Sequence, residues 1–214
     1  MRISYARRFV FLSYPRTASR SMRAVLDPVS DVIAGGWQAA GPASPYFTHA
    51  PAWHVADRMR EDGHDFGAFF SFCFVRNPYH RIASLLRMHN GPKKKPRGPR
   101  EADAFVDEIH RTAFSGGAGY RLPPRLSAPL RYFVTARDGS RLVSRIYRYE
   151  DLPAATRDIT TRIGLPLPPG SLPRRGTRGD GPGAALPFSA ESLDKIAEVY
   201  AEEIAEFGYT RPDP

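Results

Sequence analysis

Two short runs of apolar residues stand out along the chain, and each ends in a polar turn. They cover residues 9–12 and residues 70–75. A dense apolar run that ends in turn residues is typical of a buried strand in a sheet with both faces covered. Apolar residues at helical spacing follow both runs, and they are Met22, Val25 and Leu26 after the first and Ile82, Leu85 and Leu86 after the second. The pattern therefore predicts an α/β fold in which these two strands lead into helices.

Further helices are predicted downstream of these two. Pro51 suits the first turn of one helix, and the spacing of apolar residues indicates another over residues 101–113. A short helix is expected after Asp151, whose side chain is suited to an N-cap. The clearest helix begins after Ser189 and ends at Gly208. Its apolar face consists of Leu193, Ile196, Ala197, Tyr200, Ile204 and Phe207.

A β-hairpin is predicted in the second half of the chain. Residues 130–135 and 142–149 both resemble strands, and the Asp138-Gly139 pair between them is a common hairpin turn. Four stretches rich in glycine and proline are expected to be loops, at residues 35–45, 91–100, 115–129 and 164–187. Without an internal repeat or an interdomain linker, the 214 residues are expected to form one domain, 1–214.

The segment after the first predicted strand is the strongest candidate for a functional site. Pro15 ends the strand, and the next six residues are small and hydroxyl-rich with two arginines: Arg16, Thr17, Ala18, Ser19, Arg20 and Ser21. A strand, a turn of small residues and a helix start together direct backbone N–H groups and a helix dipole toward an anion. The nucleotide-hydrolase motif G-x-x-x-x-G-K-[ST] does not occur in the sequence. We therefore expect a loop of another kind that binds phosphate or sulfate.

This loop resembles the 5′-phosphosulfate loop of sulfotransferases that use 3′-phosphoadenosine 5′-phosphosulfate (PAPS). In that family a strand leads into a turn of the form P-K-x-small-[ST]-[ST]-S, which stands here as PRTASRS at residues 15–21. A second motif of the family, F-x-[FV]-R-[DN]-P-x-x-R-x-x-S, is similar to FCFVRNPYHRIAS at residues 72–84. Residues 146–152 and 207–209 also resemble the family's R-[YF]-E-[DN]-L segment and its F-G-Y ending.

The resemblance implies a fold and a set of binding residues. The fold would be a three-layer α/β sandwich with a central parallel sheet, of the P-loop NTPase-like sulfotransferase type, with ligands at the carboxyl ends of the strands. The donor would be PAPS, and the product PAP (adenosine 3′,5′-bisphosphate). By resemblance, the 5′-phosphosulfate is bound by Arg16, Thr17, Ala18, Ser19, Arg20 and Ser21, with Arg16 also catalytic. The 3′-phosphate is bound by Arg76 and Ser84, and Arg81 is the second arginine of that motif.

A histidine between the two motifs is the predicted catalytic base. An acceptor hydroxyl must lose its proton as the S–O bond forms, and a base with a pKa near neutrality contributes roughly 10²- to 10⁴-fold to such a step. His49 lies just before a predicted helix, which makes it our first choice, with His54 and Glu150 as alternatives. The other interpretation of His49 is that it hydrogen-bonds to backbone groups at the helix start.

The composition fits an anionic ligand. The formal net charge is +9 and the isoelectric point about 10.0, which suits nucleic acid, an anionic surface or an anionic small molecule. Nearly all of this charge is arginine, whose planar guanidinium binds phosphate and sulfate oxygens in pairs. For most of these arginines, a general compositional bias toward arginine is the favoured explanation. The family usually has lysine in place of Arg16 and Thr or Ser in place of Arg20, so the sequence leaves open a slow or inactive enzyme.

Other features limit the expected location and chemistry. The single cysteine, Cys73, fits a reducing compartment, and no apolar stretch is long enough to span a membrane. Because the first residues lead directly into a strand, we expect no signal peptide and a cytoplasmic, bacterial-type enzyme. Without a cluster of potential metal ligands, we expect no metal requirement. The basic loop at residues 91–100 is either a lid over an anionic acceptor or a solvated connection.

The sequence thus predicts a PAPS-dependent sulfotransferase that transfers the sulfuryl group to a hydroxyl, or an amine, of a glycan or a small molecule. Two alternatives are a nucleotide-dependent phosphotransferase, which would need a Mg²⁺ site, and a basic nucleic-acid-binding protein without enzymatic activity. We expect neither a nucleic acid nor a membrane as a partner. The acceptor and the oligomeric state do not follow from the sequence.

Overall fold

The computed structural model describes residues 1–36, 41, 45–91, 99–114, 124–166 and 185–213. Its internal contacts divide the chain into two compact units. The first unit comprises Met1–Val75 and Leu130–Arg175, and the second comprises Arg76–Pro129 and Gly176–Pro214. Among the described residues, no helix is both long and apolar enough to cross a bilayer. Each unit has a hydrophobic core of its own.

The first unit contains a five-stranded mixed sheet in the order β3-β1-β2-β4-β5. The strands are β1 (Arg2–Ser4), β2 (Phe9–Phe11), β3 (Val32–Ile33), β4 (Phe70–Val75) and β5 (Arg145–Arg148). The last three in spatial order, β2, β4 and β5, are parallel to one another. By contrast, β1 is antiparallel to both of its neighbours, β2 and β3. The predicted α/β class is confirmed, and the expected parallel centre is found in a sheet that is mixed as a whole.

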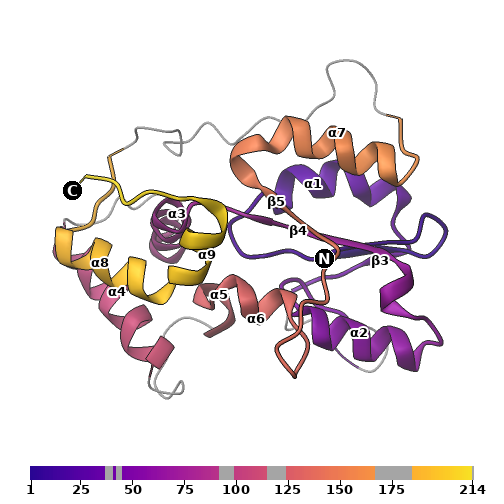
Figure 1. The fold of residues 1–214 in the computed structure, drawn as a ribbon, viewed down its shortest axis with the longest axis horizontal. Coiled ribbons are helices and arrows are strands. Elements are labelled where there is room, and N and C mark those ends of the chain that lie inside the picture. The colour runs from indigo at the N-terminus through magenta and orange to yellow at the C-terminus, as the bar shows by residue number, and fades with distance from the viewer. Residues whose placement is uncertain (37–40, 42–44, 92–98, 115–123, 167–184, 214) are drawn as a thin grey trace. The chain divides into compact units, whose positions relative to one another are not determined.

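Helices cover both faces of this sheet. The helices of the first unit are α1 (Ser19–Leu26), α2 (Ala52–Glu61), α6 (Leu130–Val134) and α7 (Leu152–Arg162). The described residues of this unit also form the 3₁₀ turns η1 (Asp27–Val29), η3 (Phe66–Ala68) and η4 (Tyr149–Asp151). Figure 1 shows α1 and α7 on one face of the sheet and α2 on the other. Asp151 precedes α7 at the predicted N-cap position, but its side chain does not cap the helix.

Aromatic side chains fill the space between the sheet and the helices α1 and α7. Phe11 and Phe72 are paired across β2 and β4, and their rings stack with centroids 5.4 Å apart. Met22 of α1 and Ile159 of α7 are fully buried in the same cluster. Burying a side chain of this size contributes about 1.5–3 kcal/mol to folding. This core therefore fixes β2 and β4 side by side, with the carboxyl ends of both strands at the same edge of the sheet.

The predicted hairpin at residues 130–149 is wrong in its first strand. Residues Leu130–Val134 form the helix α6, and β5 covers only Arg145–Arg148. The buried residues Leu130, Phe133 and Val134 are spaced as on one face of a helix. A short apolar run in the sequence does not distinguish a helix from a strand. The turn itself is confirmed, because Gly139 has a φ of +86° and a single antiparallel bridge joins Thr135 to Arg141.

The second unit is helical. It contains α3 (Pro78–Asn90), α4 (Pro99–Phe114), α5 (Pro124–Ser127), α8 (Ala190–Val199) and α9 (Ala201–Phe207). The helix predicted over residues 101–113 is confirmed as α4. The predicted loop over residues 115–129 contains α5, a short helix. The predicted loops at 35–45, 91–100 and 164–187 lie largely outside the described residues, and so does the question of a basic lid.

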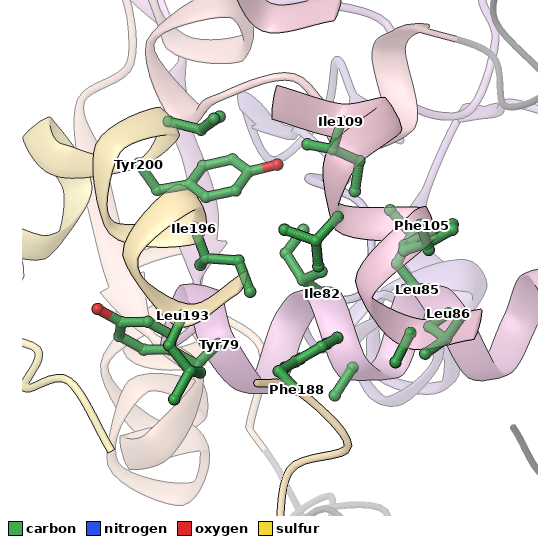
Figure 2. Packing of buried hydrophobic residues seen from close by; sticks show 14 residues of the cluster. Tyr79, Ile82, Leu85, Leu86, Phe105, Ile109, Phe188, Leu193, Ile196 and Tyr200 are labelled. Atoms are coloured by element: carbon green, nitrogen blue, oxygen red, sulfur yellow. The ribbon is translucent and has the colours of Figure 1, made fainter. Parts of the chain in front are cut away.

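Figure 2 shows the core of the second unit, in which α3, α4 and α8 present apolar side chains to one another. The labelled residues are Tyr79, Ile82, Leu85, Leu86, Phe105, Ile109, Phe188, Leu193, Ile196 and Tyr200. The apolar positions that the sequence placed on one face of these helices are therefore core positions.

The start of α3 is capped by a side chain. Asn77 accepts a hydrogen bond from the backbone N–H of Tyr79, and Pro78 occupies the first helical position.

The final predicted helix is divided in two at Tyr200. Ser189 caps α8 as predicted, since its hydroxyl accepts from the N–H of Ser192 at 3.3 Å, and Gly208 ends α9 with a φ of +62°. Between them Tyr200 leaves helical geometry, with φ and ψ of −112° and 25°. Its hydroxyl donates to the backbone carbonyl of Ser127 at 2.5 Å in a fully buried position. This contact with α5 holds Tyr200 at the point where the helix breaks.

Replacing Tyr200 with phenylalanine is expected to lower the free energy of unfolding by about 1–2 kcal/mol, because the buried carbonyl of Ser127 loses its donor while the ring remains. Urea denaturation followed by far-UV circular dichroism measures this change. The matched control is Tyr132→Phe, because Tyr132 is exposed. Equal stability of Tyr200→Phe and the wild type would show that the hydrogen bond contributes nothing.

Candidate functional site

The loop after β2 forms a tight turn that leads directly into α1. Thr17 closes the turn, because its backbone N–H and its hydroxyl both donate to the carbonyl of Tyr14, at 3.4 and 2.8 Å. The hydroxyl of Ser19 donates in turn to the carbonyl of Thr17 at 3.3 Å. The predicted loop residues are therefore brought together in one compact segment between a central strand and a helix.

The start of α1 is open to an anion. Its N-cap residue is Ala18, which has no side chain able to cap, and the first turn contains no acidic residue. The first intrahelical bond runs from the N–H of Met22 to the carbonyl of Ala18 at 3.0 Å. The N–H groups of the three residues before Met22, which are Ser19, Arg20 and Ser21, therefore point out of the helix end. Such a helix end favours a negatively charged ligand.

Backbone strain is concentrated in the predicted site segments. Among the described residues, four that are not glycine have a positive φ: Arg8, Arg16, Ala18 and His49. Three of these four belong to the loop or to the predicted base. A left-handed conformation costs an ordinary L-residue roughly 1–2 kcal/mol, and such strain is found preferentially at functional sites.

The side chains of the loop divide into two groups. Thr17 and Ala18 are buried and shape the turn, whereas Arg16 and Arg20 are exposed. Ser19 and Ser21 are half-buried at the start of the helix. Both arginines thus lie at the surface of the loop.

His49 lies against the residue that precedes this loop. Its Nδ1 is 2.6 Å from the backbone carbonyl oxygen of Ser13, and a carbonyl oxygen only accepts, so Nδ1 carries the hydrogen. In the neutral ring Nε2 is then the atom with the free lone pair. The two interpretations of His49 are therefore compatible, because one nitrogen satisfies a backbone group and the other is able to take up a proton.

The pKa of His49 is lowered to about 4, chiefly by burial and also by the positive charges of Arg23 and Arg16, while the hydrogen bond to Ser13 acts in the opposite direction. The ring is therefore neutral at pH 7 in the unliganded protein. A neutral imidazole is the form that accepts a proton, although a low pKa makes it a weak base. A negatively charged ligand beside it would raise its pKa toward neutrality.

The two alternative bases are placed differently. His54 has its Nε2 atom 3.3 Å from the carbonyl oxygen of Pro45, and its ring packs against Phe47 with centroids 5.0 Å apart. Nε2 of His54 therefore donates, and Nδ1 is the atom that keeps the lone pair in the neutral ring. Glu150 lies in η4 with its carboxylate 4.0 Å from Nε of Arg148. Of the three candidate bases, His49 is the one with a described hydrogen bond to Ser13, which lies between β2 and the loop.

Arg23 was not singled out from the sequence. It lies on α1, and its Nε donates to the carbonyl oxygen of Ser19 at 3.1 Å, so the side chain folds back toward the start of the helix. Its positive charge is one of the smaller contributions to the lowered pKa of His49, after burial. The signal that could have found it is its spacing of four residues from Ser19, because helical side chains lean toward the N-terminus.

The predicted binding residues of the second motif lie in the second unit. Arg76 follows the last residue of β4 directly and is 3% exposed, and Ser84 lies within α3 and is 1% exposed. Arg81 is fully buried, with Nη1 3.2 Å from the carbonyl oxygen of Leu126 and its guanidinium 4.8 Å from the centre of the Tyr200 ring. Arg81 therefore holds α5 and Tyr200 against α3. The binding roles of Arg76 and Ser84 remain predictions.

The described residues contain no group of three or more His, Cys, Asp and Glu side chains placed to bind a metal ion. A scan against protein-family models and a search of curated proteins found no match for this chain. The residues and their geometry alone therefore carry the functional assignment.

Proposed function

We propose that the protein is a sulfotransferase that uses PAPS and transfers the sulfuryl group to a hydroxyl of a glycan or a small molecule. The observation that carries this proposal is the loop after β2, where an uncapped helix end and Arg16 lie next to the segment that His49 contacts. A predicted anion-binding loop and a potential base, His49, are thus brought together at the segment that begins at Ser13. Both are needed to transfer a charged group to a hydroxyl.

The chemistry of the loop fits the phosphosulfate end of the donor. Backbone N–H groups, hydroxyls and guanidiniums all donate hydrogen bonds, and the first turn of α1 lacks a carboxylate that would repel an anion. In the proposal, residues 16–21 bind the 5′-phosphosulfate, while Arg76 and Ser84 bind the 3′-phosphate. The bound donor supplies an activated sulfuryl group and is released as PAP.

The chain's own groups then have distinct roles. Nε2 of His49 takes the proton of the acceptor hydroxyl, while its Nδ1 hydrogen bond to Ser13 keeps the ring oriented. Arg16 and the N–H groups of the helix start stabilise the negative charge that develops on the leaving oxygens, and they do so more strongly in the transition state than in the ground state. Arg16 has planar donors where an ammonium would rotate freely, and Arg20 provides a second guanidinium nearby.

PAP is expected to stabilise the protein much more than ATP does. Saturation at 100 times the dissociation constant adds about 2.7 kcal/mol to the free energy of unfolding, which raises the melting temperature of a chain of this size by about 5–10 °C. In Arg16→Ala the shifts with PAP and with AMP should both shrink, because both ligands carry the 5′-phosphate. Differential scanning fluorimetry with PAP, AMP and ATP measures these shifts.

The control for this experiment is Arg157→Ala, which removes an exposed arginine from α7 of the same unit. It should behave like the wild type. A melting temperature that does not respond to millimolar PAP would refute the donor assignment. Stabilisation by ATP with Mg²⁺ in place of PAP would support the phosphotransferase, and binding to DNA or RNA that weakens steeply with salt would support the nucleic-acid-binding protein.

A further inference from the structure

Arg23 is positioned to act on the ligand side of α1. Its Nε hydrogen bond to the carbonyl oxygen of Ser19 directs the guanidinium toward the start of the helix, where Ser19, Arg20 and Ser21 present their N–H groups. Within the described residues, that bond is the single hydrogen bond of the Arg23 side chain, and no carboxylate pairs with it. Arg23 is half-buried, so an ion pair made there is less screened than one at the surface.

The surroundings of His49 are strongly cationic. Two guanidiniums act on it, those of Arg23 and Arg16. The amino group of Met1 donates to the hydroxyl of Ser13 at 2.9 Å, and burial lowers its pKa to about 4, so it is neutral at pH 7. The imidazole itself is held by the carbonyl of the same Ser13. Ser13 thus positions the Met1 nitrogen and the imidazole of His49, whereas the guanidinium of Arg23 keeps donors for a ligand.

We propose that Arg23 is a specificity-determining residue that binds an acidic group of the acceptor, next to the hydroxyl that His49 deprotonates. The inference rests on the proposed sulfotransferase function and adds the class of acceptor. That class is a hydroxyl compound bearing a carboxylate, sulfate or phosphate close to the reacting hydroxyl.

An acidic acceptor has two favourable electrostatic effects at this site. Its negative charge offsets the guanidiniums that surround His49, whereas a cationic acceptor would add to the repulsion. The same charge makes protonation of His49 easier, so the base becomes stronger when the correct acceptor is bound. A neutral acceptor of equal shape brings neither effect.

The test uses a matched pair of phenols, 2-hydroxyphenylacetate and its neutral amide 2-hydroxyphenylacetamide, in which the acidic group or its neutral counterpart lies next to the hydroxyl. The wild type is expected to use the acid about tenfold more efficiently in kcat/KM, the effect of one charged hydrogen bond. In Arg23→Gln this preference should fall to about onefold, whereas Arg157→Gln, which also removes one positive charge from the first unit, should keep it. Most of the change is expected in KM.

A second readout needs neither turnover nor donor. Titration of the His49 imidazole by NMR should show that the acid raises its pKa in the wild type and in Arg157→Gln, and that the amide does not. In Arg23→Gln the acid should leave the pKa unchanged. An acid that shifts the His49 pKa equally in Arg23→Gln and the wild type, or in neither, would overturn the proposal.

The two proposals fail in different ways. If PAP does not stabilise the protein, the donor assignment fails, and the NMR titration still decides whether Arg23 binds the acid. If PAP stabilises the protein and the acid and the amide are used equally well, the sulfotransferase assignment stands and only the acidic acceptor is refuted.

Discussion

Replacing Arg76 with alanine is expected to lower sulfuryl transfer by about 10³-fold and to remove the preference of the protein for PAP over AMP. The two ligands differ in the 3′-phosphate, which we assign to Arg76 and Ser84. A guanidinium that makes two charge-assisted hydrogen bonds to one phosphate contributes roughly 3–5 kcal/mol, which corresponds to about 10²- to 10⁴-fold. Isothermal titration calorimetry with PAP and AMP measures the preference directly.

Because Arg76 is only 3% exposed, its truncation is expected to destabilise the fold as well as the ligand complex. The AMP titration controls for this effect, since general loss of structure weakens both ligands and loss of a phosphate contact weakens only PAP. Arg76→Lys keeps the charge without the planar donor pair and should recover part of the preference. Arg111→Ala, which removes an exposed arginine from α4 of the same unit, should match the wild type. If Arg76→Ala retains the PAP preference, Arg76 does not bind the 3′-phosphate.

The strands that lead to the two motifs could be predicted because they are buried on both faces. Such strands require nearly continuous apolar sequence, and residues 70–75 became β4 with both ends as predicted. The strands at the other side of the sheet gave no such signal. β1 and β3 are three and two residues long, and they exist because they pair with a neighbour, which is a tertiary contact rather than a local pattern.

The ends of helices could be predicted where a capping side chain or a glycine determines them. Ser189 and Gly208 are examples, since a hydroxyl cap and a left-handed glycine act within one turn. The break at Tyr200 has no local signal in the sequence, and the hydrogen bond made there joins Tyr200 to Ser127, 73 residues away in the sequence. The helix α6 was missed for a different reason: a five-residue apolar run fits a strand and a helix equally well.

Some features of the candidate site could likewise be predicted from the sequence, and others depend on tertiary contacts. The turn between β2 and α1 could be predicted from the order of its residues, and its role as an anion site stays a prediction. The left-handed backbone of Arg16 and Ala18 could not be predicted, because neither is a residue that prefers a positive φ. The tautomer of His49 and the proximity of Arg23 depend on how the loop, α1 and residue 49 approach Ser13, and sequence spacing does not encode that approach.

The stability of the protein is expected to fall by up to about 3 kcal/mol through His49 alone as the pH decreases from 7 to 4. Burial lowers the pKa of His49 in the folded protein to about 4, whereas an unfolded histidine titrates near 6.5. Between these values the unfolded chain binds a proton that the folded chain does not, so protonation favours unfolding. The contribution is complete above pH 6.5 and is lost as the pH falls through 4.

The variant that isolates this effect is His49→Asn, because asparagine tolerates the positive φ of +67° at this position and does not titrate. Urea denaturation of the wild type and the variant at pH 8.0, 7.0, 6.0, 5.0 and 4.5 gives the difference in their free energies of unfolding. This difference should be constant at pH 7 and above. At each lower pH, the free energy of unfolding of the wild type should decrease relative to that of the variant. Parallel pH profiles of the two proteins would mean that His49 titrates alike in the folded and unfolded states, and its burial against Ser13 would then carry no electrostatic cost.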